Sequence, residues 1–184
     1  MDPESDAVLA QRARDGDDDA FAQLMTRHKG WAFQFVRRYV GNPADAYDVL
    51  QETFFAAWRA LKRYHTDRPF EFWLRRIALN KCRDRQRRDA VRRLIGIPGV
   101  PADGGLDPAP DPLVLTESEQ AVRELETRVH LLPRALKEPL LLTALEGLSQ
   151  VQVGRLLGLS PKAVETRIYR ARIKLAMLYG RAVK

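Results

Sequence analysis

The chain has 184 residues, and its 31 lysines and arginines against 24 aspartates and glutamates give a net charge of +7. A single cysteine excludes a disulfide framework or a cysteine-rich zinc module, and no apolar run reaches the roughly 18 residues that a membrane-spanning helix needs. The acidic residues at the start lack the apolar core of a secretory signal, so we expect a cytoplasmic protein without direct membrane insertion. The basic charge favours a polyanionic partner.

Charge and composition divide the chain into three parts. Residues 61–93 carry 12 basic and 4 acidic side chains, residues 118–184 carry 12 and 6, and residues 94–117 carry 4 acidic side chains and no basic one. In that acidic stretch, Gly96 to Thr116 hold five prolines and four glycines, which disfavour a helix. We therefore predict a domain at 1–95, a linker at 96–117 and a second domain at 118–184.

The first domain is predicted to be a helical bundle, because no useful stretch alternates apolar and polar residues as a strand does. Ser5 is placed to cap a short helix that ends near Gly16, and Asp17 to Asp19 supply the cap and first-turn acids of the next helix. That second helix carries apolar or aromatic residues at helical spacing, namely Phe21, Leu24, Met25, His28, Trp31, Ala32, Phe35, Val36 and Tyr39.

A third helix is predicted to begin at Asn42-Pro43, since proline suits a first helical turn, and to end near Leu61. Its apolar stripe is expected to comprise Tyr47, Leu50, Phe54, Ala57, Trp58 and Leu61. A loop then runs from Lys62 to about Pro69, and a fourth helix from Phe70 to about Arg93. Both domains are thus expected to be all-α.

The third helix has an acidic edge that is unusual in a basic protein. Asp45, Asp48 and Glu52 lie on one face with Phe55 and Arg59, at spacings of three or four residues. One interpretation is a solvated face that maintains solubility. The other is a docking face for a partner with a basic surface.

The fourth helix has a basic face formed by Arg76, Asn80, Arg83 and Arg87. Such a face suits a phosphate backbone, because each neutralised phosphate releases counterions, although a merely solvated face remains the alternative. Aromatic residues near its start could stack on unpaired bases. The sequence favours the core for Trp73 and leaves both possibilities open for Tyr64 and Phe72.

The second domain is predicted to contain a helix-turn-helix. A helical stretch opens at Leu131-Leu132-Pro133 and stops at Gly147, with Pro139 inside it as a kink or restart. Ser149 and Gln152 form a capping box for a short helix, and a turn at 158–160 leads into the last helix. That helix is expected to bury Val164, Ile168, Ala171, Leu175 and Leu178.

The polar side of the last helix carries the side chains that could read DNA: Lys162, Glu165, Thr166, Arg167, Tyr169, Arg170 and Lys174. In a helix-turn-helix the first residues of the second helix meet base edges in the major groove, where arginine pairs with guanine and glutamate with cytosine. The alternative is an ordinary helical hairpin, but the caps, the turn and the basic face favour the DNA-binding interpretation.

Three blocks of sequence in a fixed order resemble the extracytoplasmic-function (ECF) group of bacterial sigma factors. The first is Gly16 to Phe21 with Leu24, followed by Asp45 to Phe54, which is similar to the DAEDLxQExF signature of region two. The second is Phe72 to Asn80 with Asp84 and Arg87-Arg88. The third comprises Leu132-Pro133, Glu146 to Ser149, Gly158 to Ser160 and Val164 to Arg172, and is similar to region four.

This resemblance implies a factor that binds core RNA polymerase and directs it to promoters. Its region-two acidic helix would dock on the polymerase through Asp45, Asp48, Gln51, Glu52 and Phe55. The loop and helix that follow would read the minus-ten element, with Asn80 at the pocket for a flipped base and Arg76, Arg83, Arg87 and Tyr64 beside it. Region four would bind the minus-thirty-five duplex through Lys162, Glu165, Thr166, Arg167, Tyr169 and Arg170. An anti-sigma factor is a further expected partner.

Two positions depart from the family pattern. Tyr47 stands where relatives usually have glutamate, which removes one charge from the acidic edge. Residues 149–154 read SQVQVG in place of SxxEIA, and Gln152 can still complete the capping box as glutamate would.

Two other classes of function compete with this interpretation. A helix-turn-helix repressor or activator would act without being part of the polymerase, but such regulators usually dimerise and no dimerisation heptad is present. A DNA-processing enzyme is disfavoured because the three histidines are scattered, no glycine-rich phosphate loop follows a strand, and Asp45 and Asp48 lack a third ligand. We therefore expect no catalytic residue, no metal and no cofactor.

Overall fold

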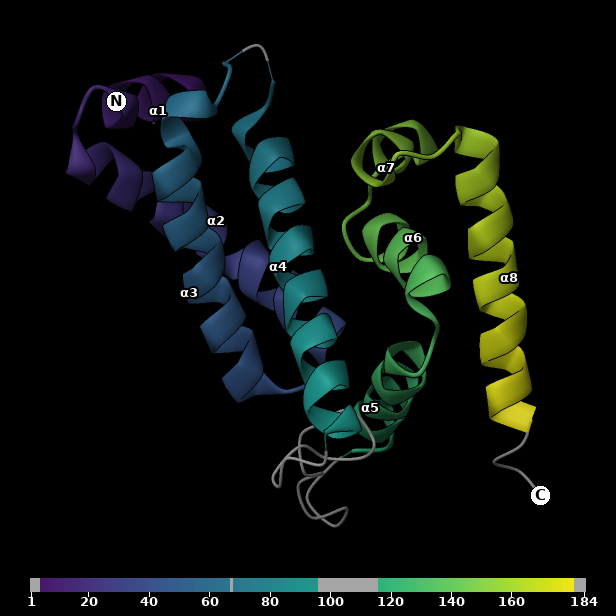
Figure 1. The fold of residues 1–184 in the computed structure, drawn as a ribbon. Helices are drawn as coiled ribbons and strands as arrows, with labels where there is room; N and C mark the ends of the chain where they lie inside the picture. The colour runs from purple at the N-terminus through teal and green to yellow at the C-terminus, as the bar shows by residue number, and fades with distance from the viewer. Residues whose placement is uncertain (1–3, 67, 96–115, 181–184) are drawn as a thin grey trace. The chain divides into compact units, whose positions relative to one another are not determined.

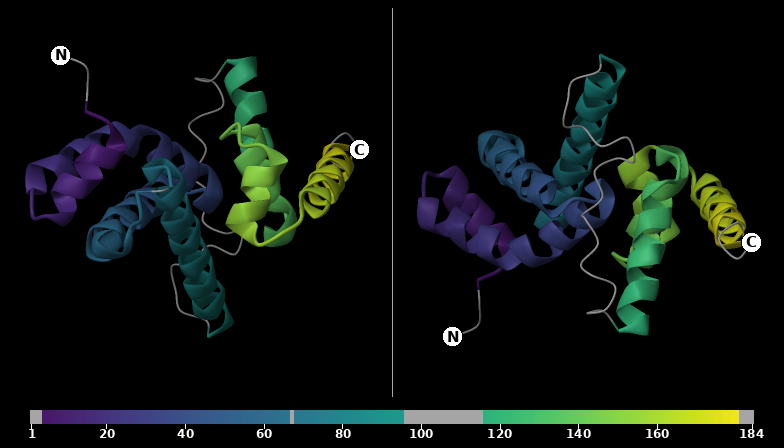
Figure 2. Two further views of the ribbon diagram at one scale, coloured as in Figure 1. Left: turned by 90° about the horizontal axis from the view of Figure 1, so that it is seen from above. Right: turned by 90° about the horizontal axis from the view of Figure 1, so that it is seen from below.

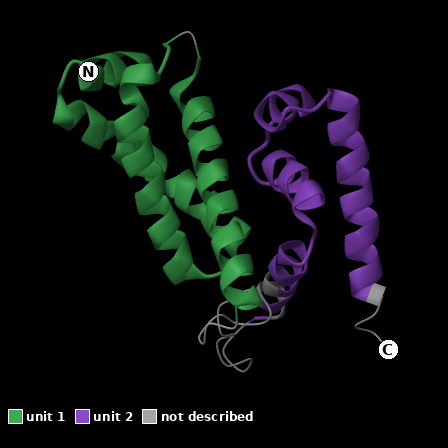
Figure 3. Ribbon diagram, in the orientation of Figure 1, with its two compact units in different colours: residues 1–105 green, residues 106–184 purple. Residues whose placement is uncertain are grey.

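The computed structural model describes residues 4–66, 68–95 and 116–180. These residues form helices and connecting turns with no β-strand among them, which confirms the all-α prediction (Figure 1). The chain separates into two compact units, residues 1–105 and 106–184 (Figure 3). Most of the predicted linker lies outside the described residues.

Unit 1 contains the four predicted helices with their predicted starts. They are α1 (Asp6–Arg14), α2 (Asp18–Val40), α3 (Pro43–Ala60) and α4 (Phe70–Leu94), with a 3-10 turn η1 (Leu61–Arg63) after α3. The side chains of Ser5, Asp17 and Asn42 accept hydrogen bonds from backbone N–H groups in the first turns of α1, α2 and α3. Each cap satisfies donors that the helix itself leaves unpaired, which is why local sequence placed these starts correctly.

Helices α2, α3 and α4 pack against one another, and α1 covers one end of α2 (Figures 1 and 2). Leu9, Leu24 and Leu74 are fully buried between them. Burial of a leucine side chain contributes about 1.5–3 kcal/mol, so this shared core fixes the helices that carry the candidate sites.

A hydrogen-bonded chain attaches the start of α1 to α2. The Asp6 carboxylate lies 2.7 Å from Nε2 of the buried His28, and the Trp31 indole N–H donates to His28 Nδ1 at 3.0 Å. The guanidinium of Arg75 on α4 stacks over the Trp31 ring at 4.6 Å. His28 therefore has a structural place that joins three helices.

The predicted apolar stripe of α3 was partly wrong. Tyr47 and Trp58 are 58 % and 52 % exposed, and the buried face consists of Ala46, Val49, Thr53, Phe54 and Ala57. These five residues form the side of α3 that faces α2 and α4. Because successive residues of an α-helix are rotated by 100°, position 47 points away from the buried position 46 and toward solvent. Tyr47 lies against Phe33 on the surface, with ring centres 4.6 Å apart.

Unit 2 consists of α5 (Glu117–His130), α6 (Arg134–Ala144), α7 (Gln150–Leu157) and α8 (Pro161–Gly180). Helix α5 was not predicted from the sequence. It contacts the end of α8, where the Arg128 guanidinium lies 3.7 Å from the centre of the Tyr179 ring. Helix α6 continues through Pro139, which is buried. A missing N–H is tolerated there because the apolar face of α6 packs against α7 and α8.

The predicted turn between α7 and α8 is present. Ser149 and Gln152 form the capping box, and Gly158 ends α7 with a φ of +69°, a conformation that favours glycine. Gly154 replaces the last residue of SxxEIA where the backbone approaches closely, because a Cβ there would lie 2.5 Å from the Leu159 carbonyl oxygen. Val164, Ile168 and Ala171 are buried as predicted, whereas Leu175 and Leu178 are half-buried.

Candidate protein and nucleic-acid interfaces

The acidic edge of α3 faces cations on α4. Arg85 Nη2 lies 2.5 Å from Asp45 Oδ1, and Arg85 Nη1 lies 3.9 Å from Asp48 Oδ2. One turn further on, Arg88 donates to Glu52 at 2.9 Å. Much of the acidic edge is therefore used inside unit 1 to join α3 to α4.

The three carboxylates of the acidic edge differ in exposure. The Asp45 side chain is 24 % exposed, and burial, together with the nearby carboxylates of Asp89 and Asp48, raises its pKa more than Arg85 lowers it. The Asp48 side chain is 68 % exposed and reaches solvent beside Arg85. Asp48 is thus the carboxylate most available to a partner, while Asp45 has mainly internal contacts.

The exposed face of α3 contains more aromatic surface than the sequence analysis predicted. Phe55 is 60 % exposed, and its ring centre lies 6.4 Å from that of Trp58. With Tyr47, Asp48 and the exposed Gln51, Phe55 lines one side of α3, and we call these four residues the α3 face; Trp58 follows near the end of the helix. Large aromatic side chains at a solvent-exposed surface are typical of protein interfaces. The signal that was available in the sequence is the (i, i+3) pair Phe55 and Trp58.

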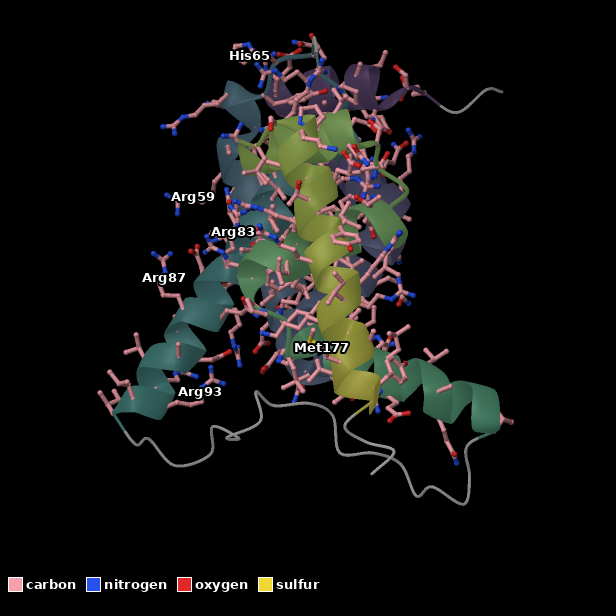
Figure 4. All side chains as sticks on the ribbon, turned by 90° about the vertical axis from the view of Figure 1, so that its right-hand side faces the viewer. Arg59, His65, Arg83, Arg87, Arg93 and Met177 are labelled. Carbon is pink, nitrogen blue, oxygen red and sulfur yellow. The ribbon has the colours of Figure 1, made fainter. Side chains whose placement is uncertain are left out.

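The predicted basic face of α4 is solvent-accessible. Arg76, Asn80 and Arg87 are exposed, and Arg83 is half-buried and donates to Asn80 Oδ1 at 3.4 Å. Arg87 pairs with Asp84 at 2.5 Å. Figure 4 shows Arg83 and Arg87 extending from one side of unit 1, together with Arg59 of α3. The amide of Asn80 lies among cations, an arrangement that suits a base attached to its phosphates.

Tyr64 does not have the exposed position that a stacking residue needs. Its ring is 2 % exposed and packs against Trp73, with ring centres 5.0 Å apart, and edge-on against Phe70 at 5.5 Å. Its hydroxyl donates to the Arg68 carbonyl oxygen at 2.5 Å. The direct DNA contact predicted for Tyr64 is therefore corrected to a core position that supports the loop, and Trp73 has the partly buried position that the sequence favoured.

The first turns of α8 present polar side chains to solvent. Lys162 Nζ pairs with Glu165 at 2.8 Å, and the Thr166 hydroxyl donates back to the Lys162 carbonyl oxygen. Tyr169 is 65 % exposed and Arg170 is exposed, whereas Arg167 is half-buried. In the part of the chain that the structure describes, Arg167 and Arg170 have no carboxylate partner. Their guanidinium groups are therefore available to bases or phosphates.

Among the residues that the structure describes, no group of three histidine, cysteine, aspartate or glutamate side chains could hold a metal ion. None of the helices described is both long and apolar enough to cross a membrane.

The family comparison decides the identity of the two units. The family model for Sigma-70 region 2 matches residues 24–92, and that for Sigma-70, region 4 matches residues 122–175. The chain is a sigma factor of the ECF group. The RNA polymerase sigma factor CnrH of Cupriavidus metallidurans is 41 % identical over 187 residues, which cover 97 % of this chain and 96 % of that protein.

More distant relatives and a solved structure agree with this assignment. The ECF RNA polymerase sigma-E factor of Escherichia coli K12 is 31 % identical to this sigma factor over 91 % of both chains. The structure of CnrH in complex with the cytosolic domain of CnrY matches with a TM-score of 0.69 and 38 % identity, over 97 % of this chain and 99 % of that one. The resemblance stated from the three sequence blocks is thereby confirmed.

Proposed function

We propose that this sigma factor binds core RNA polymerase and directs it to promoters by reading two DNA elements, one with each domain. The observation that carries this proposal is the presence of both sigma-70 regions, in order, in one chain. The predicted division into 1–95 for region two, 96–117 for the linker and 118–184 for region four gives each region its own set of exposed residues. A repressor or activator that acts without polymerase is not favoured, because region two would then have no role.

Polymerase would dock on the α3 face. Asp48 supplies an exposed carboxylate for a basic partner surface, and Phe55 and Gln51 flank it on the same side of the helix. We assign Asp45 and Glu52 a supporting role as well as a docking role, since their pairs with Arg85 and Arg88 hold α3 against α4. Tyr47 adds aromatic surface where relatives usually place a charge.

The minus-ten element would be read by the loop before α4 and by α4 itself. Asn80 would receive an unpaired base of the non-template strand, and Arg76, Arg83 and Arg87 would contact the phosphates on either side. An unpaired base is readable there because melting has already removed its stacking partners. Tyr64 would act only indirectly, through its hydrogen bond to the loop.

The minus-thirty-five element would be read as duplex by α8. Lys162, Glu165, Thr166, Arg167, Tyr169 and Arg170 occupy its first three turns, the part of a recognition helix that enters the major groove. The relative CnrH is known in complex with the cytosolic domain of CnrY. We infer by analogy that an anti-sigma factor also binds this chain.

The proposal is tested by run-off transcription with purified core polymerase on promoter fragments from the source genome. Specific transcripts that appear only with the protein are the expected result. Tight duplex binding without any transcript would instead support the repressor or activator, and would remove the roles given to Asp48 and Asn80.

Two variants separate the surfaces. Asp48→Arg should reduce capture of core polymerase without unfolding the protein, and unchanged capture would contradict the α3 face. Asn80→Ala should weaken binding to the single-stranded minus-ten element and leave minus-thirty-five duplex binding intact. Equal loss at both elements would contradict the base-pocket assignment.

A further inference from the structure

A hollow of about 420 Å³ lies in unit 1 beyond the predicted site residues. One wall is the end of α1 with the turn into α2, and the other is the last turn of α3 with η1. Arg14, Arg59 and Lys62 bring three cations to this hollow, Trp58 brings an indole, and Asp18 brings one carboxylate. A hollow of this composition suits a ligand that is both anionic and aromatic.

The charges around the hollow are available to a ligand. Lys62 and Arg59 are exposed, and neither forms an ion pair with any residue that the structure describes. The guanidinium of Arg59 lies 5.8 Å from the centre of the Phe55 ring, and Arg14 has only a weak hydrogen bond of 3.4 Å to Gln11. The cations at the hollow thus differ from Arg85 and Arg88, whose charges are neutralised by carboxylates of α3.

The charge changes sign along α3 and η1. Asp45, Asp48 and Glu52 lie toward the start of α3, whereas Arg59, near its end, and Lys62, in η1, follow the aromatic pair Phe55 and Trp58. A basic partner surface that suits these carboxylates would be repelled by the two cations. The cations Arg59 and Lys62 therefore suit a different ligand, one that is anionic.

The position of the hollow indicates which anion it would meet. Lys62 lines the hollow and belongs to η1, which directly precedes the loop into α4. Arg59, on the same wall, extends from the same side of unit 1 as Arg83 and Arg87 (Figure 4). One wall of the hollow is thus next in the chain to the loop proposed to read the minus-ten strand. An exposed indole beside unpaired cations is the arrangement by which proteins bind single-stranded nucleic acid, since every unpaired base has a face that can stack.

We propose that this hollow binds a nucleotide of the melted promoter strand adjacent to the minus-ten element. Its base stacks on Trp58, and its phosphates lie at Arg59 and Lys62. This inference rests on the proposed function and extends the DNA surface of region two from α4 to the junction of α1, α3 and η1. Duplex DNA does not suit the hollow, because the indole needs an unpaired base.

The test measures binding of reconstituted holoenzyme to forked promoter DNA whose single-stranded non-template tail is lengthened one nucleotide at a time. The double variant Arg59→Gln/Lys62→Gln should lose affinity once the tail reaches the hollow, and its salt dependence should flatten by about 0.7 in log–log slope for each lost phosphate contact. Trp58→Leu should weaken the same complexes by about tenfold, the effect of losing one stacked base.

Lys29→Gln is the matched control, because Lys29 is an exposed cation on α2 that does not line the hollow. It should leave affinity and salt slope unchanged. Capture of core polymerase is measured for every variant, so that a loss of docking is not mistaken for a loss of DNA binding.

Three results would overturn the inference. One is a double variant with the affinity and salt slope of the wild type at every tail length. Another is reduced capture of polymerase while the holoenzyme that does form binds forked DNA with wild-type affinity, which would make the hollow a polymerase contact. The third is full competition by free nucleotide, which would make it a small-molecule site. Wild-type run-off transcription distinguishes these from failure of the proposed function, since transcripts persist if only the hollow was misassigned.

Discussion

Helices α4 and α8 are both rich in arginine and lysine, yet they use this charge differently. On α4, Arg75, Lys81, Arg85, Arg87 and Arg88 all pair with carboxylates of unit 1. On α8, Lys162 pairs with Glu165, and Arg167, Arg170, Arg172 and Lys174 have no carboxylate partner among the described residues. Two helices that are similarly rich in basic residues therefore differ in how many of these side chains remain unpaired and available to DNA.

The difference agrees with the two kinds of DNA proposed for these helices. A recognition helix in the major groove needs unpaired guanidinium groups that can reach base edges. A helix that helps hold a melted strand needs a rigid frame first, and the pairs between α3 and α4 supply one. The total charge of a helix predicts neither property, because pairing depends on the neighbouring helix.

The largest effect is expected where α4 uses its charge internally. Arg85→Ala should lower the free energy of unfolding by about 2–3 kcal/mol, since it leaves the carboxylates of Asp45, Asp48 and Asp89 together without their shared cation. Urea denaturation measures this loss, and Arg76→Ala, which removes an exposed cation of the same helix, should change stability by less than about 0.5 kcal/mol.

The same variant has a defined pH dependence. The pKa of Asp45 is already raised in the folded protein, and removal of Arg85 raises it further. A carboxyl whose folded pKa exceeds its unfolded value stabilises the fold below the unfolded pKa and loses that contribution as pH rises through the folded pKa. The deficit of Arg85→Ala should thus be smaller at pH 5 than at pH 7, and an equal deficit at both would contradict the account of Asp45.

On α8 the effect should appear in DNA binding and not in stability. Arg170→Ala should reduce the binding free energy by about 2 kcal/mol at a single position of the minus-thirty-five element if Arg170 reads a base. Binding to a panel of single-base variants of the element checks this. A uniform loss across all sequences would show that Arg170 contacts only phosphate, and would make α8 resemble α4 after all.

The orientation of α8 depends on the segment before it, since within the described part of the chain α8 has no ion pair to another helix of the kind that fixes α4. Ser149→Ala removes one half of the capping box of α7 and should cost about 1 kcal/mol of unfolding free energy. Thermal unfolding measures the loss, with Ser149→Thr as the conservative control that retains a hydroxyl cap. A loss equal in both variants would mean that packing and not the cap is responsible.

The smallest effect on stability, below about 1 kcal/mol, is expected from Tyr64→Phe, which keeps the buried ring and removes the hydroxyl that donates to the Arg68 carbonyl oxygen. Binding of the minus-ten strand should weaken, because the loop before α4 loses that fixed point. Minus-thirty-five duplex binding provides the internal control. Unchanged minus-ten binding would remove Tyr64 from the reading of that element.

Tyr64 and Tyr47 show where the sequence was insufficient. Both are tyrosines next to charged residues, and the sequence left Tyr64 open between core and surface and placed Tyr47 on the buried stripe. In the structure Tyr64 is buried, with 2 % of its surface exposed, and Tyr47 is on the surface, with 58 % exposed. An amphipathic tyrosine suits either environment, and the packing of Phe70 and Trp73 against Tyr64 is contact between segments that local spacing does not report.

The sequence by itself determined the all-α fold, the helix starts at Ser5, Asp17, Asn42 and Ser149, and the family. These depend on caps, on proline and glycine, and on motif order, all of which act within a few residues. Only the tertiary structure decided which charges are available: it joined Asp45 and Glu52 to α4, buried Tyr64, and gave Arg59 and Lys62, beside Trp58, no carboxylate partner among the described residues. Charge pairing and burial depend on which helix faces which, and that arises only when the core packs.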